Sequence, residues 1–96
     1  MSETITRHLS VRGRVQGVGY RNYLEYKALQ LGVSGWVRNR TDGSVEATVQ
    51  GSETAVAAII ECAQRGPRAS QVSGVSVSDA TAAEDFRGRF EIRQTL

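Results

Sequence analysis

The sequence is poor in several residue types, and each shortage excludes a class of protein. It contains one cysteine, one histidine and one proline among 96 residues, and aromatic residues make up only 6%. The single cysteine, Cys62, excludes an internal disulfide bond, and one cysteine with one histidine provides no cluster of metal ligands. No run approaches the roughly 20 apolar residues of a membrane-spanning helix. We therefore expect no disulfide, no bound metal and no membrane association.

Charge and the N-terminus add further expectations. The formal net charge is only +2, which does not indicate the large basic footprint of a protein that binds nucleic acid. The N-terminus is polar and shows no apolar stretch of the signal-peptide type. We expect a cytoplasmic monomer without a cofactor, and 96 residues fit a single domain that spans residues 1–96.

Hydrophobic periodicity predicts five strands and two helices. Apolar residues alternate in the predicted strands and recur at helical spacing in the predicted helices. The strands are predicted over residues 5–12, 33–39, 44–50, 72–77 and 89–93, and the helices over 20–31 and from Ser52 to Gly66. A change of parity near Gly74 indicates a β-bulge, and residues 78–88 are expected to form a polar loop.

This order is βαββαβ followed by a trailing strand. It predicts an α+β, ferredoxin-like sandwich, with an antiparallel sheet, two helices on one face and a short extra C-terminal strand. The apolar stripes of both helices can then pack on the inward residues of the strands. The opposite face of the sheet is expected to carry Trp36, His8 and other mostly polar side chains.

A glycine-containing stretch, residues 13–21, joins the first predicted strand to the first predicted helix. It reads Gly13-Arg14-Val15-Gln16-Gly17-Val18-Gly19-Tyr20-Arg21. Backbone N–H groups at the start of a helix lack intrahelical partners and favour an anion. Arg21 falls in the first helical turn, where a cation is disfavoured unless a ligand neutralises it. We interpret the stretch as a cradle for one phosphoryl group, although glycines at such a turn can also form only a tight connection.

Asn39 ends the second predicted strand, and the predicted topology can bring it towards Arg21. A carboxamide has one acceptor and two donors but no useful proton affinity. It can therefore hold a water molecule in line for attack on phosphorus, but it cannot act as a general base. The alternative is that Asn39 is a turn residue before the hairpin signal Asp42-Gly43.

The remaining polar residues have simpler explanations. We expect His8 to be a surface histidine without a catalytic partner, Cys62 to be a small hydrophobic residue beside a helix stripe, and Glu46 to lie on a solvated strand face. Four further arginines either add positive potential near the cradle or are solvated surface charges; they are Arg12, Arg14, Arg38 and Arg40.

The scarcity of catalytic groups restricts the reaction. An arginine, peptide N–H groups and an amide can position a phosphoryl group and stabilise its charge. They provide no nucleophile and no general acid, so the leaving group must need no proton. A carboxylate meets this condition because its pKa is low, about 4. An acyl phosphate is therefore a suitable substrate, and an alkyl phosphate ester is not.

Two motifs of this sequence together resemble the acylphosphatase family. The first is the stretch from Gly13 to Arg21. The second is Gly35-Trp36-Val37-Arg38-Asn39 with Asp42-Gly43-Ser44-Val45-Glu46 downstream. The similarity continues through Gly66-Pro67, Val72, Val75 and Phe90-Glu91-Ile92, and so covers about Ile5 to Arg93.

The resemblance implies metal-free hydrolysis of acyl phosphates to a carboxylate and inorganic phosphate. It implies that Arg21 is the catalytic arginine that binds phosphate and that Asn39 orients the attacking water. The cradle would be formed by the backbone of Gln16, Gly17, Val18, Gly19 and Tyr20. The family usually has phenylalanine before the arginine, and Tyr20 keeps the aromatic ring at that position.

Two other functions are compatible with the predicted fold. One is a non-catalytic module that senses phosphate or a carboxylate, which a turnover assay would distinguish from an enzyme. The other is an RNA-binding domain, since RNA recognition motifs share this fold and place aromatic residues on their central strands. The predicted strand 44–50 has no aromatic residue, which argues against RNA binding.

Overall fold

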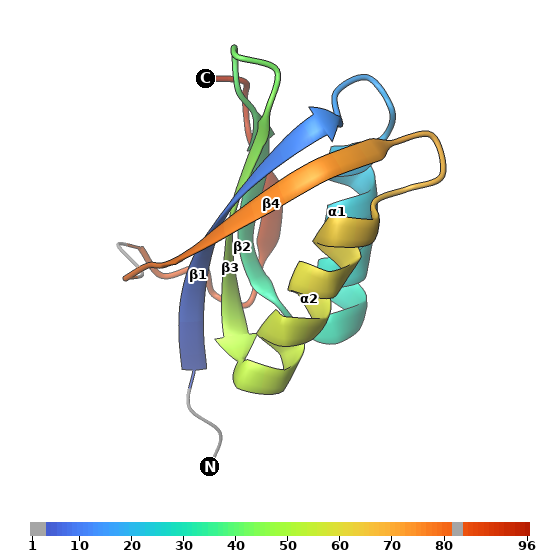
Figure 1. The fold of residues 1–96 in the computed structure, drawn as a ribbon. Helices are drawn as coiled ribbons and strands as arrows, with labels where there is room; N and C mark the ends of the chain where they lie inside the picture. The colour runs from blue at the N-terminus through green and yellow to red at the C-terminus, as the bar shows by residue number, and fades with distance from the viewer. Residues whose placement is uncertain (1–3, 82–83) are drawn as a thin grey trace.

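A computed structural model describes residues 4–81 and 84–96 of the chain. The elements follow the predicted order (Figure 1). They are β1 (Thr4–Arg14), α1 (Tyr20–Leu31), β2 (Ser34–Asn39), β3 (Val45–Ser52), α2 (Glu53–Arg65), β4 (Gln71–Asp79) and β5 (Phe90–Ile92). Neither helix is long and apolar enough to cross a membrane.

The five strands form one sheet in the order β4-β1-β3-β2-β5. The pairs among β1, β2, β3 and β4 are antiparallel, and β5 adds to the edge of β2 in the parallel direction. Both helices cover one face of the sheet (Figure 1). The predicted ferredoxin-like fold is therefore confirmed, with a mixed sheet because the short last strand is parallel to its neighbour.

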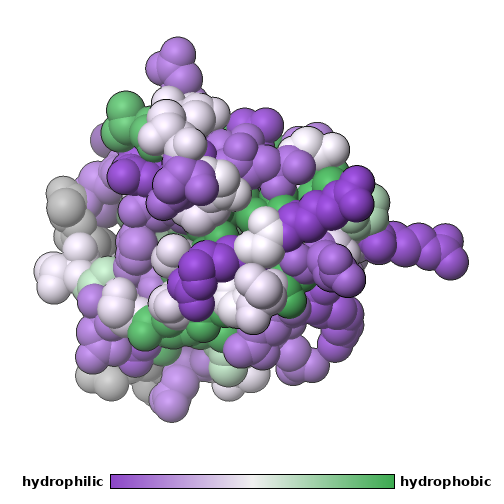
Figure 2. All heavy atoms as spheres, turned by 45° about the horizontal axis from the view of Figure 1, so that its top comes forward, coloured by the Kyte–Doolittle hydropathy of each residue, from purple (hydrophilic) through white to green (hydrophobic). Residues whose placement is uncertain are grey.

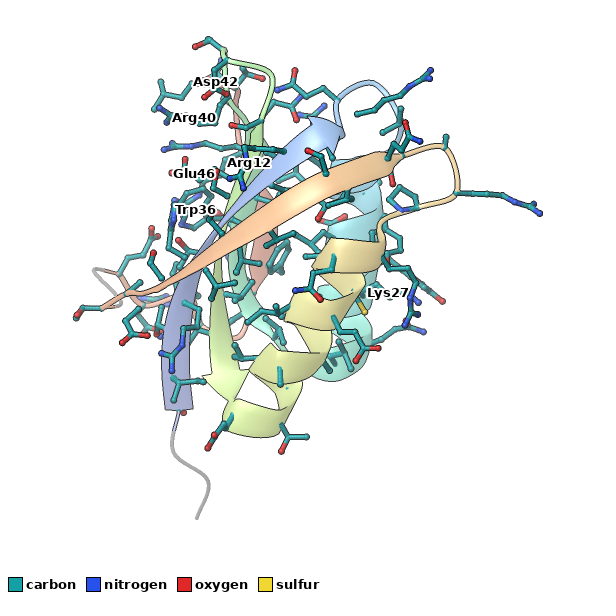
Figure 3. The ribbon with its side chains drawn as sticks, in the orientation of Figure 1. Arg12, Lys27, Trp36, Arg40, Asp42 and Glu46 are labelled. Carbon is teal, nitrogen blue, oxygen red and sulfur yellow. The ribbon has the colours of Figure 1, made fainter. Side chains whose placement is uncertain are left out.

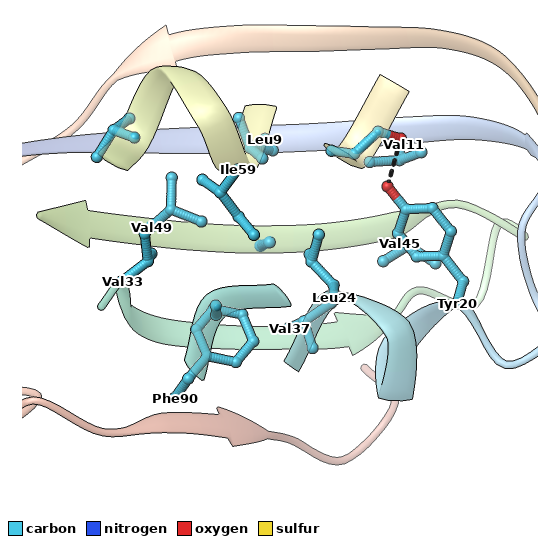
Figure 4. Packing of buried hydrophobic residues seen from close by; sticks show 14 of the residues in the cluster. Leu9, Val11, Tyr20, Leu24, Val33, Val37, Val45, Val49, Ile59 and Phe90 are labelled. Atoms are coloured by element: carbon cyan, nitrogen blue, oxygen red, sulfur yellow. Dashed lines mark hydrogen bonds between the residues drawn. The ribbon is translucent and has the colours of Figure 1, made fainter. Parts of the chain in front are cut away.

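The core lies between the sheet and the two helices (Figure 4). The central strands contribute fully buried residues at alternate positions, among them Leu9, Val11 and Val45. Helix α1 buries Tyr20, Leu24 and Ala28, and α2 buries Val56, Ile59 and Ala63. The helical spacing of these residues is what the sequence predicts for one apolar stripe on each helix.

Strand β4 differs from its predicted length but contains the predicted bulge. The strand continues to Asp79, so the first part of the predicted loop 78–88 is paired with β1. The register between β1 and β4 shifts where Arg12 pairs with Gly74 and Gly13 pairs with Val72, which leaves Ser73 as the extra residue. Later in the predicted loop, Phe86 is buried; residues 82 and 83 lie outside the described part.

The face of the sheet away from the helices carries polar side chains and Trp36, as predicted (Figure 3). The sequence did not reveal the partners of His8 and Glu46 on this face. Nε2 of His8 lies 2.7 Å from Oε2 of Glu46, and the other carboxylate oxygen accepts a hydrogen bond from Nε of Arg38. Burial alone would raise the pKa of Glu46, but hydrogen bonds from His8 and Arg38 hold it below its usual value. The antiparallel pairing of β3 with β1 and β2 brings these three residues together, which sequence spacing does not reveal.

Tyr20 links the start of α1 to the end of α2. Its hydroxyl donates a hydrogen bond of 2.8 Å to the backbone carbonyl of Ala63 (Figure 4). In a continuing helix this carbonyl would accept from the N–H of residue 67, but Pro67 has none. Tyr20 therefore satisfies a buried acceptor that the proline leaves open, and its burial raises the pKa of its hydroxyl.

Replacing Tyr20 with phenylalanine should lower the free energy of unfolding by about 1–2 kcal/mol, because the buried carbonyl of Ala63 loses its donor. Urea denaturation followed by circular dichroism measures the change. Tyr26→Phe is the matched control, since the Tyr26 side chain is exposed and its hydroxyl only accepts from Gln30 on the same helix. Equal stability of Tyr20→Phe and wild type would show that the hydroxyl contributes nothing net.

Candidate functional site

The turn between β1 and α1 has the backbone conformation that its glycines permit. Gly17 and Gly19 have φ angles of +72° and +79°, which side chains disfavour. A Cβ atom at either position would meet nothing within 4 Å, so positive φ rather than crowding requires glycine there. Gly13 has a different role, because a Cβ atom there would approach the carbonyl oxygen of Gln71 on β4 to 2.2 Å. The turn is thus open towards solvent at Gly17 and Gly19 and closely packed at Gly13.

The peptide N–H groups of residues 16–21 donate to no acceptor within the described part of the chain. Gly19 is the N-cap of α1 and provides no side-chain hydrogen bond, and the first turn of α1 contains no acidic residue. Helix α2 shows the usual arrangement instead. There Ser52 accepts from the N–H of Ala55, and Glu53 lies in the first turn. The start of α1 is therefore the helix terminus suited to an external anion.

Arg21 lies in this first turn and is half-buried. No carboxylate of the described residues forms an ion pair with it. It lines a pocket of about 240 Å³ together with Val15, Gly17, Gly19, Tyr20, Asn22 and Ile92. None of these lining residues is acidic. The guanidinium of Arg21 and the N-terminus of α1 therefore both contribute positive potential to the pocket, and no lining carboxylate opposes them.

Gln16 connects the turn to the β2–β3 hairpin. Its side-chain amide donates two hydrogen bonds of 2.8 Å, one to the carbonyl of Arg40 and one to the carbonyl of Ser44. Those two residues also bond each other, because the N–H of Arg40 donates to the carbonyl of Ser44. The side chain of Gln16 thus holds the turn against the residues that directly follow Asn39.

Asn39 is the last residue of β2. Alternation along the strand places its side chain on the same face as the fully buried Val37, which is the face that the helices cover. Its backbone pairs with Val45 on one side, and its carbonyl accepts from the N–H of Leu96 on the other. Its Oδ1 atom is buried and has no hydrogen-bond partner among the described residues. An unpaired buried acceptor is costly unless a water molecule or a ligand donates to it.

The candidate residues are only partly brought together. Gly17, Gly19, Tyr20 and Arg21 line one pocket, whereas Gln16 approaches the hairpin and Val18 packs against the core. Asn39 does not line the pocket, but Ile92, which does, pairs with Val37 two residues before it. The turn, the hairpin and the C-terminal segment lie at the same end of the molecule (Figure 1). Hydrophilic side chains cover most of this end, with smaller hydrophobic areas between them (Figure 2).

Two features of this region were not foreseen. The side chain of Gln16 bonds the hairpin, whereas the motif assigned a role to its backbone alone. Ile92 lines the pocket. The short apolar pattern of the last strand was the only signal for Ile92, and it did not indicate which residues the strand would approach. Within the described residues, no group of three or more histidine, cysteine or acidic side chains is arranged to hold a metal ion.

Comparison with known proteins agrees with the resemblance seen in the motifs. A profile of the acylphosphatase family matches residues 7–92. The acylphosphatase of Acidovorax sp. (strain JS42) is 50% identical over 93 residues, covering 97% of this chain and 94% of that protein. The acylphosphatase of Rhodopseudomonas palustris (strain ATCC BAA-98 / CGA009) is 55% identical over 100 residues, covering 100% of both chains.

The fold is also that of solved acylphosphatases. The crystal structure of acylphosphatase from Bacillus subtilis superposes with a TM-score of 0.87 at 36% identity, covering 93% of this chain and 98% of that one. The structure of an acylphosphatase from Coxiella burnetii gives a TM-score of 0.87 at 32% identity, covering 94% of this chain and 93% of that one.

Replacing Gln16 with alanine should lower the free energy of unfolding by about 1–3 kcal/mol, because two hydrogen bonds to the hairpin are lost. Urea denaturation measures this loss. Gln30→Ala is the matched control, since the Gln30 side chain is exposed on α1 and donates a hydrogen bond to the hydroxyl of Tyr26 on the same helix. If both variants unfold at the wild-type urea concentration, the two hydrogen bonds of Gln16 have no net stabilising effect.

Proposed function

The chain belongs to the acylphosphatase family, and we propose that it hydrolyses acyl phosphates with Arg21 and Asn39 as its catalytic residues. In this proposal the guanidinium of Arg21 and the backbone N–H groups of residues 16–20 bind the phosphoryl group. The carboxamide of Asn39 orients the attacking water. The observation that carries the proposal is the start of α1. There the peptide donors and the guanidinium of Arg21 have no partner among the described residues, and Gly17, Gly19 and Arg21 line one pocket.

Binding of the phosphoryl group follows from the chemistry of that pocket. The peptide N–H groups act as donors to phosphoryl oxygens, and the helix dipole adds positive potential. The planar guanidinium of Arg21 can grip two oxygens at once. Because these donors are already oriented, they stabilise the charge on the phosphoryl group in the transition state without rearrangement.

The buried Oδ1 atom of Asn39 supports the second part of the proposal. This atom has no donor among the described residues, and a water molecule that donates to it would be held at the end of β2. The two hydrogen bonds of Gln16 hold the turn against the hairpin that follows Asn39. They therefore keep the carboxamide of Asn39 in a constant position relative to the β1–α1 turn, which binds the phosphoryl group.

The reaction itself then needs little proton transfer. The oxygen of the water forms a bond to phosphorus while the bond from phosphorus to the acyl oxygen breaks. The electron pair of that bond leaves with the carboxylate, which needs no proton at neutral pH because its pKa is about 4. Both protons of the water remain with the phosphate product. An arginine, backbone donors and an amide thus suffice for an acyl phosphate.

Replacing Arg21 with alanine should reduce kcat/KM for benzoyl phosphate by roughly 10²–10³ or more, and should also weaken inhibition by inorganic phosphate, because the main positive charge is lost. The assay is run without added metal and with a chelator. Arg65→Ala is the control, since Arg65 is exposed on α2 and forms a salt bridge with Glu61 one turn earlier. Activity of Arg21→Ala close to wild type would rule out the assigned role.

Replacing Asn39 with alanine should have a different signature. We expect kcat to fall by roughly 10²–10³, while the inhibition constant of inorganic phosphate stays within a few fold of wild type, because the cradle is intact. If phosphate binding weakens as much as turnover, Asn39 belongs to the cradle or to the fold. A wild-type protein that binds phosphate but does not turn over benzoyl phosphate would instead be a sensing module.

A further inference from the structure

We infer that Ile92 contacts the acyl group of the substrate, so that the enzyme favours acyl phosphates whose acyl group is apolar, either aromatic or branched aliphatic. This inference rests on the proposed function, because it takes the pocket beside Arg21 as the site of the phosphoryl group. It concerns the other half of the substrate, which the arginine, the peptide donors and Asn39 do not explain.

The position of Ile92 in the sheet directs its side chain towards the pocket. Ile92 pairs with Val37 in the parallel register of β5 and β2, so their side chains lie on the same face of the sheet. Val37 is fully buried under the helices, whereas Ile92 lies at the edge strand and remains 36% exposed. This edge borders the start of α1, and Ile92 lines the pocket with Arg21 and Asn22.

Ile92 is also the apolar side chain that the pocket offers to a ligand. The two other large apolar lining residues, Val15 and Tyr20, are each only 1% exposed. The two chain neighbours of Ile92, Glu91 in β5 and Arg93 directly after it, are charged and belong to the opposite face. There they pair with each other, and Arg93 stacks on Trp36. Ile92 therefore presents accessible apolar surface beside Arg21, and an apolar group of a ligand can contact that surface.

The size of the pocket leaves room for such a group. Its volume of about 240 Å³ is several times the roughly 30 Å³ that a water molecule occupies in the liquid. A phosphoryl group fills only part of that space, and the acyl group must leave from the side away from the attacking water. A single partly exposed isoleucine provides a contact of a few carbon atoms, and each CH₂ group removed from water contributes about 0.8 kcal/mol.

The test compares benzoyl phosphate with acetyl phosphate on Ile92→Thr, which keeps a β-branched residue in the strand but removes apolar surface. We expect the ratio of kcat/KM for benzoyl phosphate to kcat/KM for acetyl phosphate to fall roughly 3–10-fold. The inhibition constant of inorganic phosphate is measured in parallel, because a change in it would show that Ile92 supports the cradle. Val77→Thr is the matched control, since Val77 is 44% exposed on β4 and does not line the pocket.

A second variant, Ile92→Val, removes one methyl group. It should give a ratio of kcat/KM values between those of wild type and Ile92→Thr, and it tests the inference if Ile92→Thr does not fold. An unchanged ratio in a folded, active variant overturns the inference but leaves the proposed function intact. Equal losses on both substrates with weaker phosphate binding also overturn it, because Ile92 then supports the cradle. Wild type that hydrolyses neither substrate overturns the proposed function itself.

Discussion

The structure around the site depends on a group of peptide N–H donors, those of residues 16–21, that find no acceptor in residues 4–81 and 84–96. Two glycines in left-handed conformation carry the chain from β1 into α1, and no side chain caps the helix that follows. Helix α2 has both a serine cap and an acidic first turn, so the same chain satisfies one helix start and leaves the other open. The local structure of α1 thus favours an anion at the expense of its own capping.

The rest of the fold surrounds these donors with groups from distant parts of the chain. Gln16 joins the turn to the hairpin after Asn39. The segment after β5 runs beside β2, where Arg93 donates to Val37 and Leu96 donates to Asn39. Tyr20 is the first residue of α1, and its hydroxyl donates a hydrogen bond to the carbonyl of Ala63 in the last turn of α2. The turn is therefore held on two sides, by the end of the sheet and by the helix pair, while its N–H groups bond no other described residue.

Most of the fold could be predicted because its signals are local. The alternation of Val45, Ala47 and Val49 and the helical spacing of Val56, Ile59 and Ala63 each indicate one buried face. The parallel pairing of β5 with β2 could not be predicted, since three residues contain too little pattern to choose a neighbour or a direction. The interaction of His8 with Glu46 was missed for a related reason. It depends on the register between two strands, which one-dimensional spacing does not contain.

Short segments of the sequence were enough to predict the βαββαβ order, the glycine turn before α1 and the candidacy of Arg21 and Asn39. Glycine conformation, helix periodicity and side-chain chemistry are local properties. Three further features became visible only in the folded chain: the amide of Gln16 bonds the hairpin, Oδ1 of Asn39 is buried without a partner among the described residues, and Ile92 joins Arg21 in one pocket. Such contacts depend on how the strands pair and the helices pack, and the packing of the whole core determines both together.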